Sequence, residues 1–314
     1  MEKLAIVAVG GNSLIQDPTD PRIERQWQAV HQTSRHIVDM IMDGWHVVVT
    51  HGNGPQVGYN LRRAEIAAKE GLHELPMDII VASTQGSIGY MLQQALDSEL
   101  RRRGVNRTCA TVVTQMIVAA DDPAFQNPTK PVGGFMTQQE AERYQAAGWD
   151  VMEDAGRGWR RVVASPIPRA VHEINAIQAL MLGGYVVIAC GGGGIPVIRD
   201  ETGMLRGVYA VIDKDRASSL LALTLRADLF VISTAVEKVA LNFNTPEQVD
   251  LDQMTLAEAR RYIDEGHFAQ GSMLPKVSAV VDFVQNGGPQ AVITDPQNLT
   301  RALRGETGTR ILPA

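Results

Sequence analysis

The chain has 314 residues, of which 45% are hydrophobic, 20% charged and 5% aromatic, a composition typical of a globular protein and unlike a disordered tail or a disulfide scaffold. Its 29 lysines and arginines against 35 aspartates and glutamates give a net charge of -6, which argues against nucleic acid as a partner. The apolar run from Leu4 to Val9 is too short for a signal sequence or a membrane span, so we expect a cytoplasmic protein without a membrane partner.

Short apolar runs alternate along the chain with longer amphipathic stretches, a pattern typical of parallel strands joined by crossover helices. The apolar runs are rich in Val, Ile and Ala and hardly alternate, which indicates strands covered on both faces. The predicted strands are 4–9, 45–50, 108–114, 185–190, 229–233 and 291–294. The predicted helices are 24–42, 77–103, 170–182, 214–225, 256–265 and 275–285. The sequence therefore predicts an α/β fold, with a mainly parallel sheet between helical layers.

Residues 117–165 interrupt this rhythm. The segment contains DDPAFQNPTKPVGGF and EDAGRGWRRVVASPIP, which are rich in proline, glycine and charge. This composition predicts a lobe or lid that projects from the sheet rather than another strand and helix. A long surface insertion without a role is the alternative. We therefore expect one domain over residues 1–314, with a protruding subdomain at 117–165.

Three of the predicted strands are followed by glycine-rich loops. In an open α/β sheet, ligands bind beyond the carboxyl ends of the strands, so these loops are expected to face one edge. Bare backbone N–H groups in such loops approach an anion closely, which makes phosphate the simplest common ligand. Tight turns that need glycine for geometry alone are the alternative for any single loop. The loops are Gly10-Gly11-Asn12-Ser13, Gly52-Asn53-Gly54 after His51, and Gly191-Gly192-Gly193-Gly194.

The common phosphate-binding motifs are not present. A P-loop requires GxxxxGK[ST], and the dipeptide Gly-Lys does not occur in the chain. A dinucleotide fingerprint requires GxGxxG, whereas Gly52 and Gly54 are followed next by Gly58. The HRD and DFG motifs of protein kinases are also missing. The glycine loops therefore indicate another class of phosphate-binding protein.

Charged residues at two predicted helix starts fit a phosphoryl-transfer site. Lys214 and Asp215 fall in the first turn of a helix, where a cation is unfavourable unless it holds an anion. Lys276 also opens a helix, and Lys130 lies at the tip of the lobe. For Asp213 and Asp215 we favour an organising role over direct ligation of a metal, because Mg²⁺ usually keeps several waters and binds the substrate phosphates.

His51 is the one histidine directly beyond a predicted strand. It has the chemistry of a general base, but a histidine that fixes a turn through hydrogen bonds to the backbone is the interpretation we favour.

The motifs, taken together, resemble the carbamate kinases of the amino acid kinase superfamily. They follow in order from end to end: GGN, THGNGPQVG, TQGSIGYMLQQAL, DDPAFQNPTKPVG, RRVVASPIP, GGGGIPV, VIDKD and GSMLPKV. The resemblance implies a three-layer αβα sandwich, a homodimer, and the reaction ATP + carbamate ⇌ ADP + carbamoyl phosphate, with arginine metabolism as one setting. It also implies that the N-terminal half binds the carbamoyl substrate and the C-terminal half, about 185–314, binds the nucleotide.

The resemblance also implies roles for individual residues. Lys130 would reach over the transferring group, Lys214 and Lys276 would neutralise ATP phosphates, and Asp215 would hold the lysines. Mg²⁺ would be bound through the ATP phosphates, without a direct protein ligand. The cradle for carbamate and the phosphoryl group would be Gly10, Gly11, Asn12, Gly52, Asn53 and Gly54. The nucleotide side would be lined by Gly193, Gly194, Thr234, Ala235 and Val236. Two positions depart from the family pattern, Ser13 in the carbamate pocket and Ala235 on the nucleotide side.

Carbamate is already an anionic oxygen nucleophile, so its phosphorylation needs no general base. The protein has to position the reactants and stabilise negative charge, tasks for which glycine N–H groups, lysines and Mg²⁺ are suited. Two alternatives stay open at this point. One is a kinase of the same fold that acts on another small carboxylate or amino acid, and the other is a nucleotide-binding regulatory protein without turnover.

Overall fold

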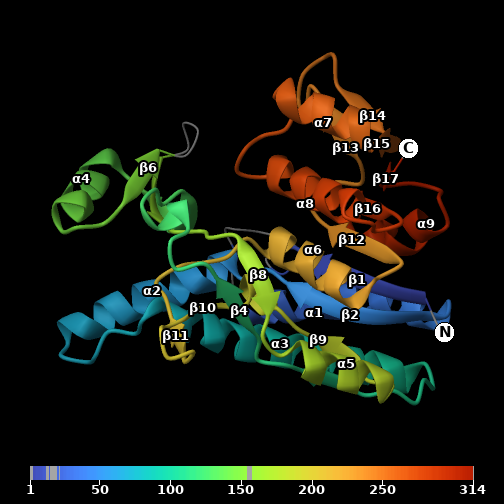
Figure 1. Ribbon diagram of the computed structural model, residues 1–314, viewed down its shortest axis with the longest axis horizontal. Coiled ribbons are helices and arrows are strands. Elements are labelled where there is room, and N and C mark those ends of the chain that lie inside the picture. Colours follow the sequence, from blue (N-terminus) through green and yellow to red (C-terminus); the bar gives the residue numbers. More distant parts are fainter. Residues whose placement is uncertain (1–2, 12–13, 15–19, 21, 154–157, 314) are drawn as a thin grey trace.

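The computed structural model describes residues 3–11, 14, 20, 22–153 and 158–313. Its centre is an eight-stranded sheet with the order β15-β17-β16-β12-β1-β2-β9-β3 (Figure 1). All neighbouring strands in it run parallel except β16 and β17, so the predicted mainly parallel sheet is confirmed. The strands are β1 (Lys3–Val9), β2 (Trp45–His51), β3 (Cys109–Thr111), β9 (Val186–Ile188), β12 (Leu229–Ser233), β15 (Gln253–Thr255), β16 (Ala291–Thr294) and β17 (Thr309–Leu312).

Helices cover both faces of this sheet, as the hardly alternating strands predict. Successive side chains of a strand point to opposite faces, and in β1 Leu4, Ile6 and Ala8 join one buried cluster while Ala5, Val7 and Val9 join another. The second cluster contains side chains of α1 (Ile23–Met42), α3 (Met77–Arg102) and α9 (Leu299–Leu303). The first contains side chains of α5 (Ile174–Leu182), α6 (Lys214–Leu225), α7 (Leu256–Asp264) and α8 (Met273–Gln285). The fold is therefore the expected three-layer αβα sandwich.

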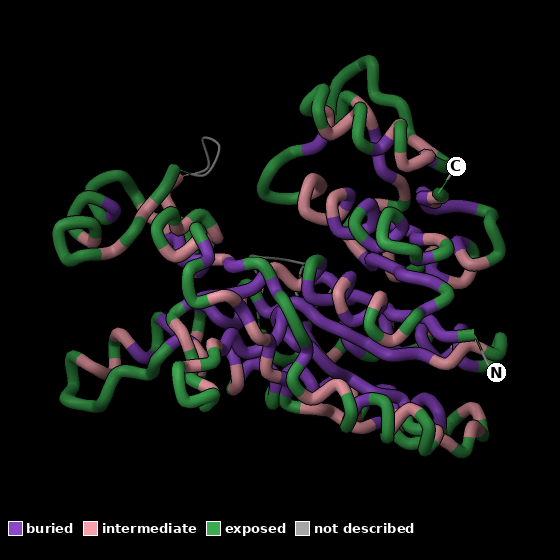
Figure 2. The backbone as a smooth tube through the Cα atoms, in the orientation of Figure 1, coloured by how far each residue is buried: buried purple, intermediate pink, exposed green. Residues whose placement is uncertain are grey.

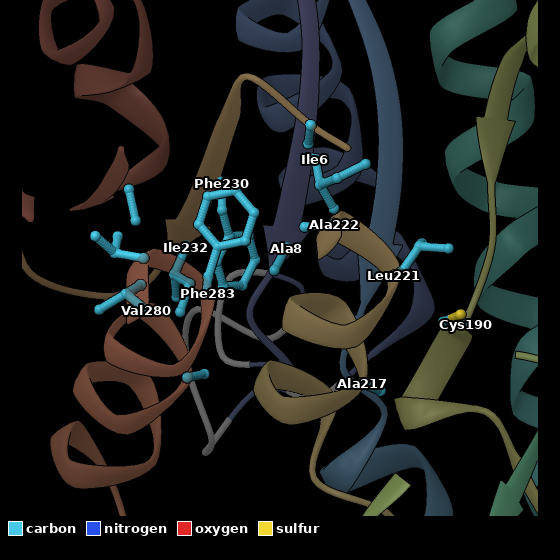
Figure 3. Packing of buried hydrophobic residues seen from close by; sticks show 14 of the residues in the cluster. Ile6, Ala8, Cys190, Ala217, Leu221, Ala222, Phe230, Ile232, Val280 and Phe283 are labelled. Carbon is cyan, nitrogen blue, oxygen red and sulfur yellow. The ribbon is translucent and has the colours of Figure 1, made fainter. Parts of the chain in front are cut away.

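Aromatic packing joins the C-terminal helices to the sheet. Phe230 of β12 and Phe283 of α8 are fully buried, with ring centroids 5.6 Å apart in an edge-to-face arrangement (Figure 3). Ile6 of β1 and Ala222 of α6 lie in the same cluster. This packing holds α6 and α8, which carry Lys214 and Lys276, against the same face of the sheet.

Several elements differ from the predicted ones. Residues 54–69 form a helix that was not predicted, α2 (Gly54–Lys69), so the second glycine loop ends at Asn53. The predicted helix 170–182 is too long, because its first residues pair as β8 (Pro168–Val171) and the helix begins at Ile174. The predicted strand 108–114 is reduced to the three residues of β3.

A second, four-stranded sheet was also not predicted. Its order is β11-β10-β4-β8, formed by β11 (Leu205–Gly207), β10 (Ile195–Arg199), β4 (Gln115–Val118) and β8. Its strands are short, and β4 pairs with β10 across a large separation in sequence, which local patterns do not reveal. A hairpin of β13 (Val239–Leu241) and β14 (Val249–Leu251) follows β12, and the short 3-10 turns are η2 (Pro123–Phe125), η3 (Gly191–Gly193) and η4 (Pro296–Asn298).

The lobe contains its own small sheet, β5-β7-β6, with β5 (Lys130–Met136), β7 (Trp159–Val163) and β6 (Val151–Glu153). Its helix α4 (Gln138–Ala146) begins with a capping box between Thr137 and Glu140. The lobe projects from the body of the molecule at the left of Figure 1, and Figure 2 shows that most of it is exposed while the central sheet is buried.

The lobe is seated on α2 by a close backbone contact. A Cβ atom on Gly58 would lie only 2.4 Å from Cα of Gly133 in β5, so only glycine allows this approach. Beside it, Arg161 of β7 forms an ion pair of 3.1 Å with Glu65 of α2. The position of the lobe against α2 therefore depends on glycine at Gly58.

No helix within the described ranges is long and apolar enough to cross a membrane.

Candidate active site

The three glycine loops meet at the carboxyl ends of β1, β2 and β9. The N–H of Gly10 donates to the Ser233 carbonyl at 3.0 Å, and the N–H of Gly52 donates to the Val9 carbonyl at 2.9 Å. A Cβ on Gly52 would lie 2.8 Å from the nitrogen of Gly11. The third loop also lies close to the second. A Cβ on Gly192, where φ is +66°, would lie 2.1 Å from Nδ2 of Asn53. Glycine is therefore required at Gly52 and Gly192 by contact, and at Gly192 also by conformation.

The start of α6 brings charge to the same place. Asp213 caps this helix, because its Oδ1 accepts hydrogen bonds from the N–H groups of Asp215, at 2.9 Å, and Arg216, at 3.3 Å. Lys214 follows it, and the stem of Lys214 packs against Gly52, whose Cβ would lie 3.1 Å from Cδ of the lysine. Lys214 is thus positioned against a loop of the N-terminal half.

Asp215 binds two lysines with its two oxygens. Oδ1 accepts a short hydrogen bond from Nζ of Lys214, and Oδ2 lies 3.5 Å from Nζ of Lys276. Lys276 also donates to the carbonyl of Ser272 at 3.2 Å. The side chain of Asp215 is 3% exposed, against 12% and 17% for the two lysines. The carboxylate therefore lies behind the two ammonium groups and holds them together.

Lys130 reaches the same site from the lobe. Its Nζ lies 2.5 Å from Oδ2 of Asp213, in an ion pair that is mostly screened from solvent. Burial alone would raise the pKa of Asp213, but the charge of Lys130 and its hydrogen bond hold that pKa well below its ordinary value. Asp213 therefore carries a negative charge and binds the ammonium of Lys130.

The electrostatics of Lys214 are balanced between burial and its neighbours. Burial lowers the pKa of Lys214 below its ordinary value. The negative charge of Asp215 raises this pKa, and the positive charge of Lys276 lowers it further. Asp215 is thus the neighbour that most favours the charged form of Lys214.

His51 is the last residue of β2 and is 1% exposed. Its Nδ1 donates to the carbonyl of Gly52 at 3.1 Å, so the interpretation of a turn-fixing histidine is confirmed. Burial lowers the pKa of His51 to about 4, which leaves the ring neutral near pH 7.

The glycine loops and the charged side chains, but not His51, line one open cleft with a volume of about 230 Å³. Among the predicted site residues, the cleft is lined by Gly10, Gly11, Gly52, Asn53, Gly54, Lys130, Lys214, Asp215, Thr234 and Lys276. Gly193 and Gly194 are not among its lining residues; they are buried, and Cβ atoms there would meet Ile212 and Met116. Ala235 and Val236, in the segment after β12, are also not among the lining residues. Ala235 is exposed and Val236 is half-buried. Asn12 and Ser13 lie outside the described residues.

Two residues that support the loops were missed in the sequence. Thr84 accepts a hydrogen bond from Nδ2 of Asn53 at 2.8 Å. Gln85 accepts from the N–H of Thr114 at 2.8 Å and donates to the carbonyl of Gly191 at 3.0 Å, so it ties two loops to α3. Both are buried. The sequence pattern that could have identified them is a pair of polar residues on the buried face of a predicted helix, within TQGSIGYMLQQAL.

The chain is similar to known proteins over almost its full length. Residues 3–295 match the amino acid kinase family. The chain is 50% identical to a carbamate kinase-like protein, YahI, of Escherichia coli K12 and 48% identical to a carbamate kinase of Thermococcus kodakarensis, each over 99% of both chains. The solved structure of a carbamate kinase from Giardia lamblia bound to citric acid superposes with a TM-score of 0.92 at 41% identity, over 99% of this chain and 98% of that one.

Proposed function

Because this chain belongs to the amino acid kinase family, we infer that it is a carbamate kinase, which transfers a phosphoryl group reversibly between ATP and carbamate. Relatives that carry this name cover nearly the whole chain at 47–48% identity. The observation that carries the inference is the cleft, in which Lys214 and Lys276, held by Asp215, face the glycine loops after β1 and β2. A phosphoryl group between the two sides would contact backbone N–H groups and ammonium groups at once.

The chemistry follows from these groups. A carboxylate oxygen of carbamate attacks the γ-phosphorus, the bond to the bridging oxygen breaks, and ADP leaves. Negative charge grows on the transferring group and the leaving oxygen, where preorganised cations and N–H donors stabilise it. We propose that Lys214 and Lys276 bind the nucleotide phosphates and that Lys130 reaches the transferring group from the lobe. Carbamate is already deprotonated, so the neutral, buried His51 is not required as a base.

We propose that Mg²⁺ enters with the nucleotide, bound to its phosphates, and when bound it would neutralise part of their charge. Asp213 and Asp215 are the carboxylates that line the cleft in the described part of the chain, and each already binds lysine. Among the described residues no group of three or more His, Cys, Asp or Glu is placed to hold a metal. Because both carboxylates are paired with lysines, we propose that the lysines bind the nucleotide phosphates and that Asp213 and Asp215 do not ligate Mg²⁺ directly.

We also propose a division of labour between the two halves. The loops at Gly10–Gly11 and Gly52–Gly54 would bind carbamate, with Asn12 beside them. The nucleotide would lie along residues 185–314, near Thr234, Ala235, Val236 and the third glycine loop. Since ATP is its substrate, we place the enzyme in the cytoplasm. We propose a homodimer, which light scattering on the purified protein would test, and arginine metabolism as one setting.

The test is the reverse reaction, measured as ATP formed from ADP and carbamoyl phosphate with Mg²⁺ present. We expect turnover with carbamoyl phosphate. Activity only with another acyl phosphate would identify a kinase with a different acceptor. Binding of ADP without any ATP formed would identify a nucleotide-binding regulatory protein instead.

A further inference from the structure

Asn53 does not cap the helix that it precedes. It occupies the N-cap position of α2, where asparagine usually accepts a hydrogen bond from an N–H group in the first turn. Its side chain makes no such bond here. Its amide nitrogen instead donates to Oγ1 of Thr84 in α3, at 2.8 Å. A residue that breaks a local rule in this way is typical of a functional site.

The hydrogen bonds of Thr84 determine which way the Asn53 amide is turned. The Thr84 hydroxyl has one hydrogen, and it donates this hydrogen to the carbonyl of Val81 at 2.7 Å. Thr84 can therefore only accept from Asn53, so the amide nitrogen must face Thr84. On another side the amide packs against Gly192, where even a Cβ would lie 2.1 Å from Nδ2.

The oxygen of the Asn53 amide is available as an acceptor in the described part of the chain. Asn53 is 3% exposed and lines the cleft. Within the described ranges no donor is bound to its Oδ1. In the described part of the chain, Oδ1 of Asn53 is therefore an acceptor without a bound donor, on a residue that lines the cleft.

We propose that Thr84 is a positioning residue that sets the acceptor specificity, because it turns Oδ1 of Asn53 toward the amino group of carbamate. The proposal rests on the proposed function. Carbamate carries an –NH₂ donor where acetate carries a methyl group, and the two are otherwise similar in shape. A buried carbonyl oxygen that is paired by the amino group is left unpaired by the methyl group, which penalises acetate.

The experiment compares carbamoyl phosphate with acetyl phosphate as phosphoryl donors to ADP. We expect the wild-type chain to prefer carbamoyl phosphate in kcat/KM. Thr84→Val keeps the shape but removes the acceptor for the Asn53 nitrogen, and we expect the preference to fall by about tenfold or more, through loss of activity with carbamoyl phosphate. Thr84→Ser keeps the hydroxyl and is expected to retain the preference.

A matched control is Ser83→Ala. Ser83 is an exposed neighbour on α3 whose hydroxyl also donates to a backbone carbonyl, that of Ile79 at 2.8 Å. We expect this variant to keep both the activity and the preference. Circular dichroism checks the fold of each variant, and Thr84→Ala replaces Thr84→Val if the latter does not fold.

The outcomes separate this proposal from the proposed function. If the wild-type chain uses carbamoyl phosphate and Thr84→Val lowers activity equally with both donors, Thr84 is only structural and the proposal is wrong. An unchanged preference in Thr84→Val also overturns it. If the wild-type chain forms no ATP from carbamoyl phosphate, the proposed function itself fails, and the specificity role fails with it.

Discussion

The ammonium of Lys130 lies 2.5 Å from Oδ2 of Asp213, although the two residues are 83 positions apart in the sequence. Lys130 begins β5 in the lobe, whereas Asp213 caps α6 in the body of the protein. The other oxygen of Asp213 binds the first N–H groups of α6. One carboxylate therefore ties the lobe to the helix that carries Lys214.

Asp213→Asn is expected to lower kcat/KM about tenfold, equivalent to about 1.4 kcal/mol. An amide oxygen still caps α6, but the charge that holds Lys130 over the cleft is lost. Asp213→Ala loses the cap as well, so its free energy of unfolding should fall by about a further 1 kcal/mol. Steady-state kinetics and urea unfolding measure the two effects.

A double-mutant cycle tests whether the two residues act together. In the Lys130→Met background, Asp213→Asn should cost much less activity than in the wild-type chain, because the partner is already gone. Strictly additive effects would show that Asp213 acts on the reaction without Lys130.

The same pair gives a pH dependence of stability. The pKa of Asp213 in the folded protein is held well below its ordinary value of 3.8, since Lys130 outweighs the effect of burial. A depressed pKa stabilises the folded state fully above the unfolded value, and that contribution is lost as the pH falls toward the folded value. The difference in unfolding free energy between the wild-type chain and Asp213→Asn should therefore shrink below about pH 4. A difference that stays constant from pH 7 to pH 3 would contradict the ion pair.

Lys214→Ala is expected to cost about 3–4 kcal/mol of transition-state stabilisation, or two to three decades in kcat, with the fold intact. Asp215 holds the lysine, whose stem packs against the glycine loop at Gly52, so a cation from solvent should not replace its charge. Lys69→Ala, at the exposed end of α2, is the matched control and should leave turnover unchanged. Near-normal turnover of Lys214→Ala would remove this lysine from the mechanism.

Asp215→Asn should move the alkaline limit of activity to lower pH. Burial lowers the pKa of Lys214, and Asp215 is the neighbour that opposes this most. Without the carboxylate the pKa of Lys214 falls further, so the ammonium loses its proton earlier, by about one pH unit. The measurement is the pH profile of kcat.

Introducing Lys214→Arg into Asp215→Asn is the control for this pH shift. Arginine stays protonated, so the alkaline limit should return to higher pH even if the overall rate is low. An alkaline limit that does not move in Asp215→Asn would show that the charge of Lys214 does not depend on Asp215.

The parts of the fold that could be predicted are those with a strong local signal. The runs that form β1, β12 and β16 are apolar because both of their faces are buried, and their predicted bounds agree closely with the structure. The helix α2 was missed because it opens with Gly54-Pro55 and contains Gly58. That glycine is explained only by the tertiary contact with the lobe.

The candidate site shows the same limit. The glycine loops can be recognised in the sequence because their backbone geometry requires glycine. The lysines at helix starts can be recognised because the helix dipole disfavours a cation there. The pairs that organise the site are not visible. Asn53 and Thr84 are 31 residues apart, and Lys130 and Asp213 are 83 residues apart, so only the folded chain brings each pair together.

Gly58→Ala should displace the lobe from its contact with α2. Gly58 lies inside α2, where alanine would otherwise stabilise the helix by about 1 kcal/mol. The added Cβ would lie 2.4 Å from Cα of Gly133, and a backbone atom cannot yield as a flexible side chain can. The lobe must shift, which moves Lys130 away from Asp213. We therefore expect lower kcat/KM, a lower free energy of unfolding and faster cleavage of the lobe in limited proteolysis.

Gly86→Ala is the matched control for this prediction. Gly86 also lies inside a helix, α3, but a Cβ there meets no atom within 4 Å. The control should keep full activity and gain stability by up to about 1 kcal/mol, because only the helix propensity changes. If Gly58→Ala behaves like Gly86→Ala in both stability and turnover, the contact with Gly133 does not hold the lobe, and the activity does not depend on its seat.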